Sequence, residues 1–150
     1  MQKTSPILFA AFALQLLPLA SIAQTKYLRT AEETRKSAES VVASVAAGNP
    51  TGAWKELRAL TVIPPAEFEV FEAQFGSQMG SMLHRFGPAN GYEFVREELA
   101  GKSVIRYTFV VKHEKAPMRW LFVFYQAPKG WVVTGVKFDG NTSALFPSGG

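Results

Sequence analysis

The sequence contains few residues of the types that perform acid–base chemistry, and those few lie far apart. It has two His, His84 and His113, and a single Asp, Asp139, directly before Gly140. Acid–base catalysis needs a base and a proton donor held together where burial can shift their pKa values. We instead expect Asp139 in a turn, His84 near a helix end that favours cations, and His113 solvated at a hairpin tip. No catalytic residue is therefore predicted.

Other kinds of reaction centre are equally poorly supplied. The chain has no Cys, which excludes disulfides, zinc–thiolate sites and cysteine nucleophiles. Two distant His residues cannot complete a metal shell, and neither a Ser-His-Asp set nor a phosphate-binding Gly loop occurs in the sequence. We therefore predict no metal and no cofactor.

The polar groups that could meet a ligand lie among aromatic residues of the C-terminal half. The strand pairing that we predict places Arg96 opposite Tyr107, beside Phe109 and Phe122, on the buried face of a sheet. Arg96 could there receive the anionic end of a small ligand. In the alternative, its stem packs on the Tyr107 ring and caps the rim of the core. These four residues are the predicted ligand-binding candidates.

Residues 1–23 have the features of a secretory signal peptide. Lys3 precedes an apolar run from Ile7 to Ala20, and Ser21-Ile22-Ala23 matches the small-x-small cleavage pattern. The run is shorter than the roughly twenty residues that a membrane-spanning helix needs. We predict cleavage after Ala23, no membrane span after cleavage, and a secreted protein of the periplasm; an uncleaved anchor is the alternative.

The charge of the mature chain gives little indication of a partner. Loss of Lys3 lowers the formal net charge from +4 to +3, and the bases cluster only in "KHEKAPMR" at 112–119. A nucleic-acid-binding surface needs a basic stripe with a recognition motif behind it. No nucleic-acid partner is therefore predicted, and the remaining length fits one domain.

Two helices are predicted near the start of the mature chain. Thr30 and Glu33 form a capping box, after which small apolar residues recur at helical spacing as far as Gly48. Asn49 and Pro50 are typical of the cap and first turn of a short second helix.

A third, longer helix follows the Pro64-Pro65 break and ends at Gly87-Pro88. Its apolar stripe contains Phe68, Phe71, Phe75, Met79, Met82, Leu83 and Phe86. Gly76 and Gly80 each cost about 1 kcal/mol relative to Ala inside a helix, so we expect the first helix to approach closely there.

From Tyr92 the apolar period changes to two, which predicts strands at 92–99, 104–113, 118–126 and 131–139. Short turns join them into an antiparallel meander. The predicted fold class is α+β, with three N-terminal helices packed on one face of a curved four-stranded sheet.

Turn lengths fix the predicted strand pairing. A two-residue turn at Gly101-Lys102 makes three pairs: Phe94 with Phe109, Tyr92 with Val111, and Glu97 with Arg106. A turn that pairs His113 with Met118 then makes three more: Phe109 with Phe122, Val111 with Trp120, and Tyr107 with Phe124. One face becomes aromatic, and we assign the helices to it.

The opposite face of the sheet also carries apolar side chains, among them Val110, Leu121, Val123 and Tyr125. One layer of helices cannot cover both faces, and an exposed apolar strip of this size is typical of an interface. We predict a homodimer that buries about 800 Å² per partner. In the alternative, the chain is a monomer whose tail, "ALFPS", folds back over that face.

The facing of the last strand depends on its turn. Pairing Gln126 with Trp131 would add four residues to the opposite face, and a bulge near the turn would exchange the two faces of this strand. The four residues are Val132, Thr134, Val136 and Phe138.

With these elements in place, the chain resembles the nuclear transport factor 2-like superfamily, in particular its small exported bacterial members of unknown function. The resemblance is carried by "AEETRKSAESVVASVAAGNPTGAWKEL" and "RWLFVFYQAPKGWVVTGVKF", and it covers most of residues 30 to 139. It implies a cone-shaped α+β fold. The strand or hairpin that the family has between the second and third helices is reduced here to "TVIPP". Because the superfamily includes isomerases, dehydratases, carriers and dimerisation modules, the resemblance does not fix a function.

These observations predict three segments: a cleaved signal peptide at 1–23, a nuclear transport factor 2-like domain at 24–140, and a flexible tail at 141–150. The predicted function is that of an exported, non-catalytic binding or assembly module that dimerises through its sheet face, with a periplasmic protein as a further possible partner. One alternative is a carrier of a small apolar ligand between the third helix and the sheet. Another is an isomerase-like enzyme with Tyr107 as the proton donor.

Overall fold

Three helices and four strands follow one another along the chain, as predicted. The computed structural model describes residues 24–147, so the predicted signal peptide lies outside the described residues. The elements are α1 (Ala31–Ala46), α2 (Pro50–Leu60), α3 (Pro65–Phe86), β1 (Ala89–Ala100), β2 (Val104–His113), β3 (Pro117–Ala127), β4 (Gly130–Asp139) and the 3₁₀ turn η1 (Thr142–Leu145). The strands form one antiparallel sheet in the order β1-β2-β3-β4. The α+β fold class is confirmed.

The first two helices start at the side chains that the sequence indicates. Thr30 Oγ1 accepts a hydrogen bond from the Glu33 amide at 3.1 Å. The Glu33 carboxylate accepts from the Arg29 amide at 2.7 Å, one residue earlier than in the usual capping box. Asn49 Oδ1 accepts from the Gly52 amide at 3.0 Å, ahead of the Pro50 turn. Both helix starts are therefore encoded locally.

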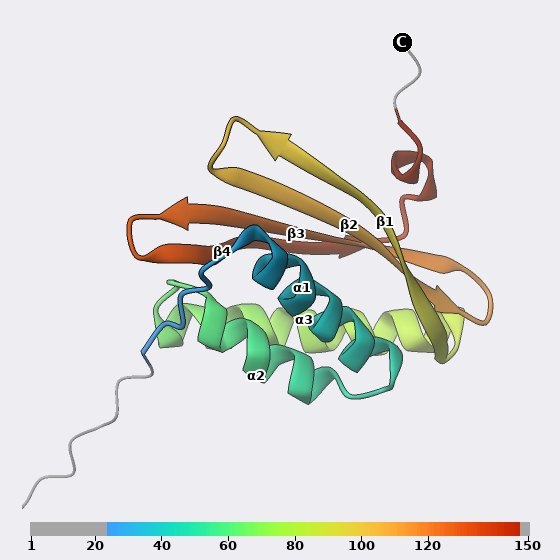
Figure 1. The fold of residues 1–150 in the computed structure, drawn as a ribbon. Coiled ribbons are helices and arrows are strands. Elements are labelled where there is room, and N and C mark those ends of the chain that lie inside the picture. Colours follow the sequence, from blue (N-terminus) through green and yellow to red (C-terminus); the bar gives the residue numbers. More distant parts are fainter. Residues whose placement is uncertain (1–23, 148–150) are drawn as a thin grey trace, which may run out of the picture.

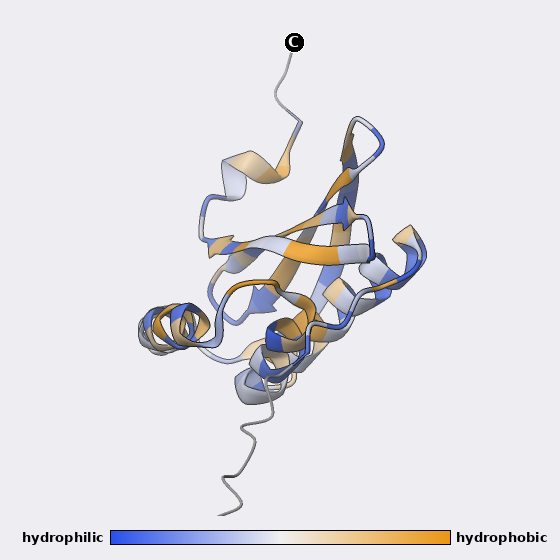
Figure 2. Cartoon of the chain, turned by 90° about the vertical axis from the view of Figure 1, so that its left-hand side faces the viewer, coloured by the Kyte–Doolittle hydropathy of each residue, from blue (hydrophilic) through white to orange (hydrophobic). Residues whose placement is uncertain are grey.

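All three helices lie on one side of the curved sheet, and η1 lies on the other side (Figure 1). The view at 90° shows the same separation (Figure 2). We call the helix-covered side the inner face and the other side the outer face. No helix among residues 24–147 is both long and apolar enough to cross a membrane.

Aromatic side chains fill the space between the helices and the inner face. The Phe75 ring of α3 lies edge-on to Trp54 of α2, to Trp120 of β3 and to Phe138 of β4, with centroid distances of 3.7, 5.4 and 4.3 Å. Trp120 also stacks on Phe122 and on Phe138. Each such pair contributes about 0.5–1.5 kcal/mol beyond the burial of its area. Phe75 therefore joins α2 and α3 to the sheet.

The prediction for Gly76 and Gly80 is wrong. Both residues lie on the exposed side of α3, and a Cβ atom added to either would meet no atom within 4 Å. The apolar stripe that contains Phe75 and Met79 faces the core instead. Close helix packing is therefore not the reason for these glycines.

In the first hairpin, two of the three predicted residue pairs are confirmed and one is wrong. Phe94 lies opposite Phe109 and Tyr92 opposite Val111, as predicted, but Arg106 pairs with Glu98 rather than with Glu97. The turn is one residue longer than expected, and a bulge at Val95 then absorbs the difference.

The bulge also changes the direction of Arg96. Arg96 lies opposite Thr108, and Tyr107 lies opposite Glu97. The predicted pairing of Arg96 with Tyr107 is therefore wrong.

The second hairpin is displaced by two residues from its predicted register. Phe109 pairs with Trp120, Tyr107 with Phe122, and Val111 with Met118. The displacement arises because the loop that follows His113 is two residues shorter than predicted: the His113 amide donates to the Ala116 carbonyl, which leaves only Glu114 and Lys115 between the paired residues. Since a shift of two residues leaves every side chain on its face, the aromatic inner face forms as predicted.

The last strand begins in the predicted register and then changes face. Gln126 pairs with Trp131, and Val132 lies opposite Tyr125 on the outer face. A bulge at Thr134, rather than at the turn, then turns Val136 and Phe138 inward, where they pack against the core. The predicted outward direction of these last two residues is wrong.

Candidate functional site

The Tyr107 hydroxyl joins the sheet to the start of α1. Tyr107 is fully buried, and its hydroxyl lies 2.9 Å from Thr34 Oγ1 and 3.1 Å from the carbonyl oxygen of Ala31. Burial raises the pKa of Tyr107, so the phenol is held in its neutral form. Within residues 24–147 this hydroxyl has no hydrogen bond to a carboxylate or a His. The geometry therefore indicates that the Tyr107 hydroxyl links β2 to α1 and contributes to the stability of the fold.

The other inner-face candidates belong to a closed aromatic layer. Phe109 and Phe122 are fully buried, and their ring centroids lie 6.0 Å apart. At the rim of this layer, the Arg35 guanidinium of α1 lies 4.1 Å from the centroid of Phe94. Arg35, rather than Arg96, is the cation that packs on an inner-face ring. The surface pockets described below are not lined by Tyr107, Phe109 or Phe122.

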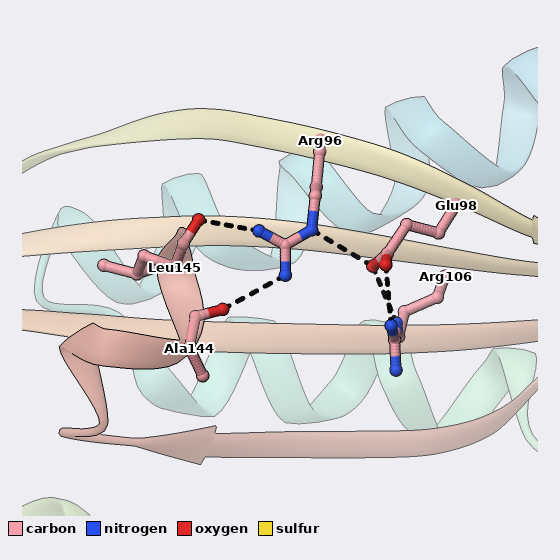
Figure 3. A network of polar contacts seen from close by, with 5 residues as sticks. All are labelled: Arg96, Glu98, Arg106, Ala144 and Leu145. Carbon is pink, nitrogen blue, oxygen red and sulfur yellow. Dashed lines mark hydrogen bonds and ion pairs between the residues drawn. The ribbon is translucent and has the colours of Figure 1, made fainter. Parts of the chain in front are cut away.

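Arg96 lies on the outer face and holds the C-terminal tail. Its Nη1 donates to the Leu145 carbonyl at 2.7 Å, and its Nη2 donates to the Ala144 carbonyl at 3.1 Å. Its Nε lies 3.2 Å from the Glu98 carboxylate. Figure 3 shows these contacts on the side of the strands away from the helices. Part of the outer face is thus covered by the chain's own tail, as in the monomer alternative.

Two bidentate ion pairs flank this contact. Arg106 donates from Nε and Nη2 to Glu98 at 2.8 and 2.7 Å. Arg119 donates from Nε and Nη2 to Asp139 at 3.0 and 2.6 Å. These hydrogen bonds are the main reason that the pKa values of both carboxyl groups lie below their ordinary range.

Asp139 also acts as the predicted turn residue. Its carboxylate accepts from the Asn141 amide at 3.0 Å and lies 3.4 Å from Lys137 Nζ. Asp139 is also the last residue of β4, and its ion pair with Arg119 joins the end of β4 to β3.

A pocket of about 810 Å³ lies between the tail and the outer face. The sheet contributes three guanidinium groups, one carboxylate and one apolar side chain to its lining, and the tail contributes the rest. The lining residues are Arg96, Glu98, Arg106, Arg119, Leu121, Asn141, Ser143, Ala144, Phe146 and Pro147. We call this feature the tail pocket.

The predicted interface residues occupy different environments on the outer face. Val110 is buried, and Leu121 is half-buried and lines the tail pocket. Val123 is half-buried, whereas Tyr125 is 43% exposed. The open apolar part of this face is therefore at Val123 and Tyr125, beyond the tail.

The two His residues behave differently from each other. His84 is exposed near the end of α3, where it was expected. His113 is only 7% exposed, and its Nδ1 donates to the Gly87 carbonyl at 2.8 Å. The prediction of a solvated His113 is wrong, because the hairpin tip packs against the turn after α3.

Within the described part of the chain, no group of three His, Asp or Glu residues is placed to hold a metal ion.

The feature that the sequence did not predict is the tail pocket. Outward-facing Arg106 and the nearby acid Glu98 were visible signals, but the bulge that turns Arg96 outward and the path of the tail were not.

Comparison with known proteins adds no assignment. No model of a protein family matches the chain, and a search of curated proteins finds no significant match.

Proposed function

We propose that the protein is a non-catalytic binding or assembly module that dimerises through the outer face of its sheet. The observation that carries this proposal is the difference in cover between the two faces. The helices and an aromatic core close the inner face, whereas the outer face keeps half-buried Val123 and exposed Tyr125 beside the tail. A second copy that pairs the same patch with itself would bury them by two-fold symmetry.

The inner face supports a non-catalytic role. The hydroxyl of Tyr107 is occupied by Thr34 and Ala31, and the surrounding rings fill the layer. An isomerase would need a base within hydrogen-bond reach of its substrate and donor. The geometry around Tyr107 does not favour that alternative.

The oligomeric state tests the proposal directly. The protein from residue 24 onward is measured by light scattering at about 100 µM, a concentration at which an interface of standard size is expected to be occupied. The expected mass is twice that of the chain. Val123→Asp should shift the protein to a monomer because it places a charge in the apolar patch.

A matched control distinguishes the interface from a general effect of charge. Val70 is 59% exposed on α3, far from the outer face, so Val70→Asp should remain dimeric. A monomeric parent protein, or equal behaviour of the two variants, would refute dimerisation through this face.

Two pockets support the carrier alternative. One, of about 410 Å³, lies where the end of α3 meets the sheet, and its lining includes Met79, Leu83, Ala89 and His113. This volume lies within the roughly 300–1,000 Å³ of usual ligand sites.

The second pocket is smaller. An apolar pocket of about 160 Å³ lies between α2, α3 and β4, lined by residues that include Leu57, Ile63, Phe68, Phe71 and Val136. Its volume is below the roughly 300–1,000 Å³ of usual ligand sites, so only a very small apolar molecule would fit. Native mass spectrometry of protein purified from its host would detect a retained ligand, and a bare protein mass would count against a carrier.

We further propose export to the periplasm and a nuclear transport factor 2-like family membership. Export is supported by the signal-like pattern of residues 1–23, and membership is supported by the order of three helices and a curved meander. Intact mass of the periplasmic protein tests the first, with Gln24 as the expected first residue. A homologue profile that matches the superfamily tests the second.

A further inference from the structure

Three arginines from three neighbouring strands converge on the tail pocket. Arg96 of β1, Arg106 of β2 and Arg119 of β3 all line it, against a single lining carboxylate, Glu98. Asp139 and Lys137 adjoin Arg119 and cancel each other in charge. The pocket therefore carries an excess of positive charge, although the protein as a whole has only a small net charge.

Two of these guanidinium groups retain donors that could serve a ligand. A guanidinium has five N–H donors. Arg106 and Arg119 each use Nε and Nη2 for a carboxylate, and within residues 24–147 neither Nη1 makes a hydrogen bond. The carboxylates fix both groups in place, so little side-chain freedom would be lost on binding.

A buried hydroxyl without a partner lies in the middle of the same face. Thr108 is fully buried, and its Oγ1 is the one buried side-chain polar atom among the described residues that makes no hydrogen bond. Thr108 is paired across the sheet with Arg96 on one side and Leu121 on the other, and both line the tail pocket. Thr108 does not itself line the pocket, so its hydroxyl is an unpaired polar group next to the site and not a proposed ligand contact.

The rest of the lining is suited to a short apolar group. Leu121 of β3 and Ala144, Phe146 and Pro147 of the tail contribute the apolar part of the lining. Phe146 is 71% exposed, so contact with a ligand would remove apolar surface from water. The volume of about 810 Å³ lies within the range of small-molecule sites.

From this arrangement we infer that the tail pocket binds a small organic oxyanion, a carboxylate or a phosphate with a short apolar part. The Nη1 groups of Arg106 and Arg119 hold the anionic group, and Leu121 and Phe146 contact the apolar part. The tail, held by Arg96, closes the site. This ligand site goes beyond the proposed dimerisation and does not depend on it, because Val123 and Tyr125 do not line the pocket.

A titration of the protein from residue 24 to 150, followed by NMR, tests the inference. The probes are benzoate, phenyl phosphate, inorganic phosphate and the neutral analogue benzamide. Benzoate or phenyl phosphate should shift the amide signals of Arg106, Arg119 and the tail, with saturation at roughly millimolar concentration for ligands of this size. The stronger of the two identifies the preferred anionic group, and inorganic phosphate, which lacks an apolar part, should bind more weakly than phenyl phosphate.

Variants assign the binding to the pocket. Arg119→Gln removes one charge-assisted donor and should weaken benzoate or phenyl phosphate about tenfold. Arg106→Gln should have a similar effect and alters a more exposed side chain, so it remains informative if Arg119→Gln does not fold. The matched control is Lys112→Gln, which removes a base that is paired with Glu93 on the same sheet and does not line the pocket. Its affinity should equal that of the parent protein.

Three results would overturn the inference. They are an absence of saturable shifts with both organic anions, an equal response to benzamide and benzoate, and unchanged affinity in a folded Arg106→Gln variant.

Discussion

Tyr107 and Thr108 are neighbours on β2 that face opposite sides of the sheet, and they show how differently the two sides are built. Both side chains are fully buried. The inward hydroxyl of Tyr107 has two partners on α1, whereas the outward hydroxyl of Thr108 has none within residues 24–147. The inner face is therefore a closed core in which the buried hydroxyl of Tyr107 is hydrogen-bonded. The outer face combines ion pairs, a hydroxyl without a hydrogen-bond partner and a pocket, and it is the face for which we propose contacts with other molecules.

The largest expected contrast comes from truncating one aromatic residue on each face. Phe122→Ala should lower the free energy of unfolding by about 3–5 kcal/mol, because it leaves a cavity in the filled aromatic layer. Tyr125→Ala should cost less than about 1 kcal/mol in the monomer, because Tyr125 is 43% exposed. Denaturant unfolding at low protein concentration measures both. Similar losses in the two variants would contradict the difference between the faces.

The ion pair between Arg119 and Asp139 provides the next effect. Asp139→Asn should cost about 1–3 kcal/mol at pH 7, since it leaves the largely buried Arg119 without its carboxylate. Folding lowers the pKa of Asp139, so the stabilisation is complete above the ordinary value of 3.8 and is lost as the pH falls through the lowered value. The gap between parent and variant in urea unfolding should therefore narrow below about pH 4.

Glu93→Gln is the control for this pH dependence. Its ion pair with Lys112 lies on the same sheet, but both side chains are well exposed, and such pairs contribute about 0–1 kcal/mol. A cost as large as that of Asp139→Asn would show that burial does not set the strength of these pairs.

A smaller effect is expected from the inward hydroxyl. Tyr107→Phe should lower the free energy of unfolding by about 1 kcal/mol, because it removes the contact of Tyr107 with Thr34 and Ala31. Burial raises the pKa of Tyr107, so above about pH 10 the unfolded chain loses this proton while the folded chain keeps it. Stability of the parent protein should therefore fall with pH in that range more steeply than that of the variant. Parallel pH profiles would argue against a buried neutral phenol.

The outward hydroxyl should give the smallest effect. Thr108→Val removes a hydroxyl that has no hydrogen bond in the described residues and keeps the shape of the side chain. The free energy of unfolding should change by less than about 0.5 kcal/mol or rise, because burying an unpaired polar group is unfavourable. A loss above about 1 kcal/mol in thermal or chemical unfolding would mean that Thr108 has a partner that stabilises the fold.

Local signals in the sequence predicted most of the fold. The caps at Thr30 and Asn49 are formed within four residues of chain, and the apolar stripe of α3 follows from helical spacing alone. The aromatic inner face was also predictable, because the error of two residues in the second hairpin preserves the alternation of side chains.

The outer face was less predictable because it depends on irregular and non-local features. The bulges at Val95 and Thr134 each insert a residue that strict alternation does not reveal, and they reversed the expected directions of Arg96 and Phe138. The position of the tail depends on a contact between Arg96 and carbonyl groups almost fifty residues later in the chain.

The extra residue at Val95 has a consequence for tracing this protein through evolution. Before Val95, the even-numbered side chains of β1, such as Phe94, point toward the helices. After Val95, the even-numbered side chains, such as Arg96, point away from them. A homologue that had lost this single insertion could retain every arginine in an alignment and still direct the side chain equivalent to Arg96 into the hydrophobic core. Strand length, rather than conservation of the basic residue, would then decide which descendants inherited the pocket.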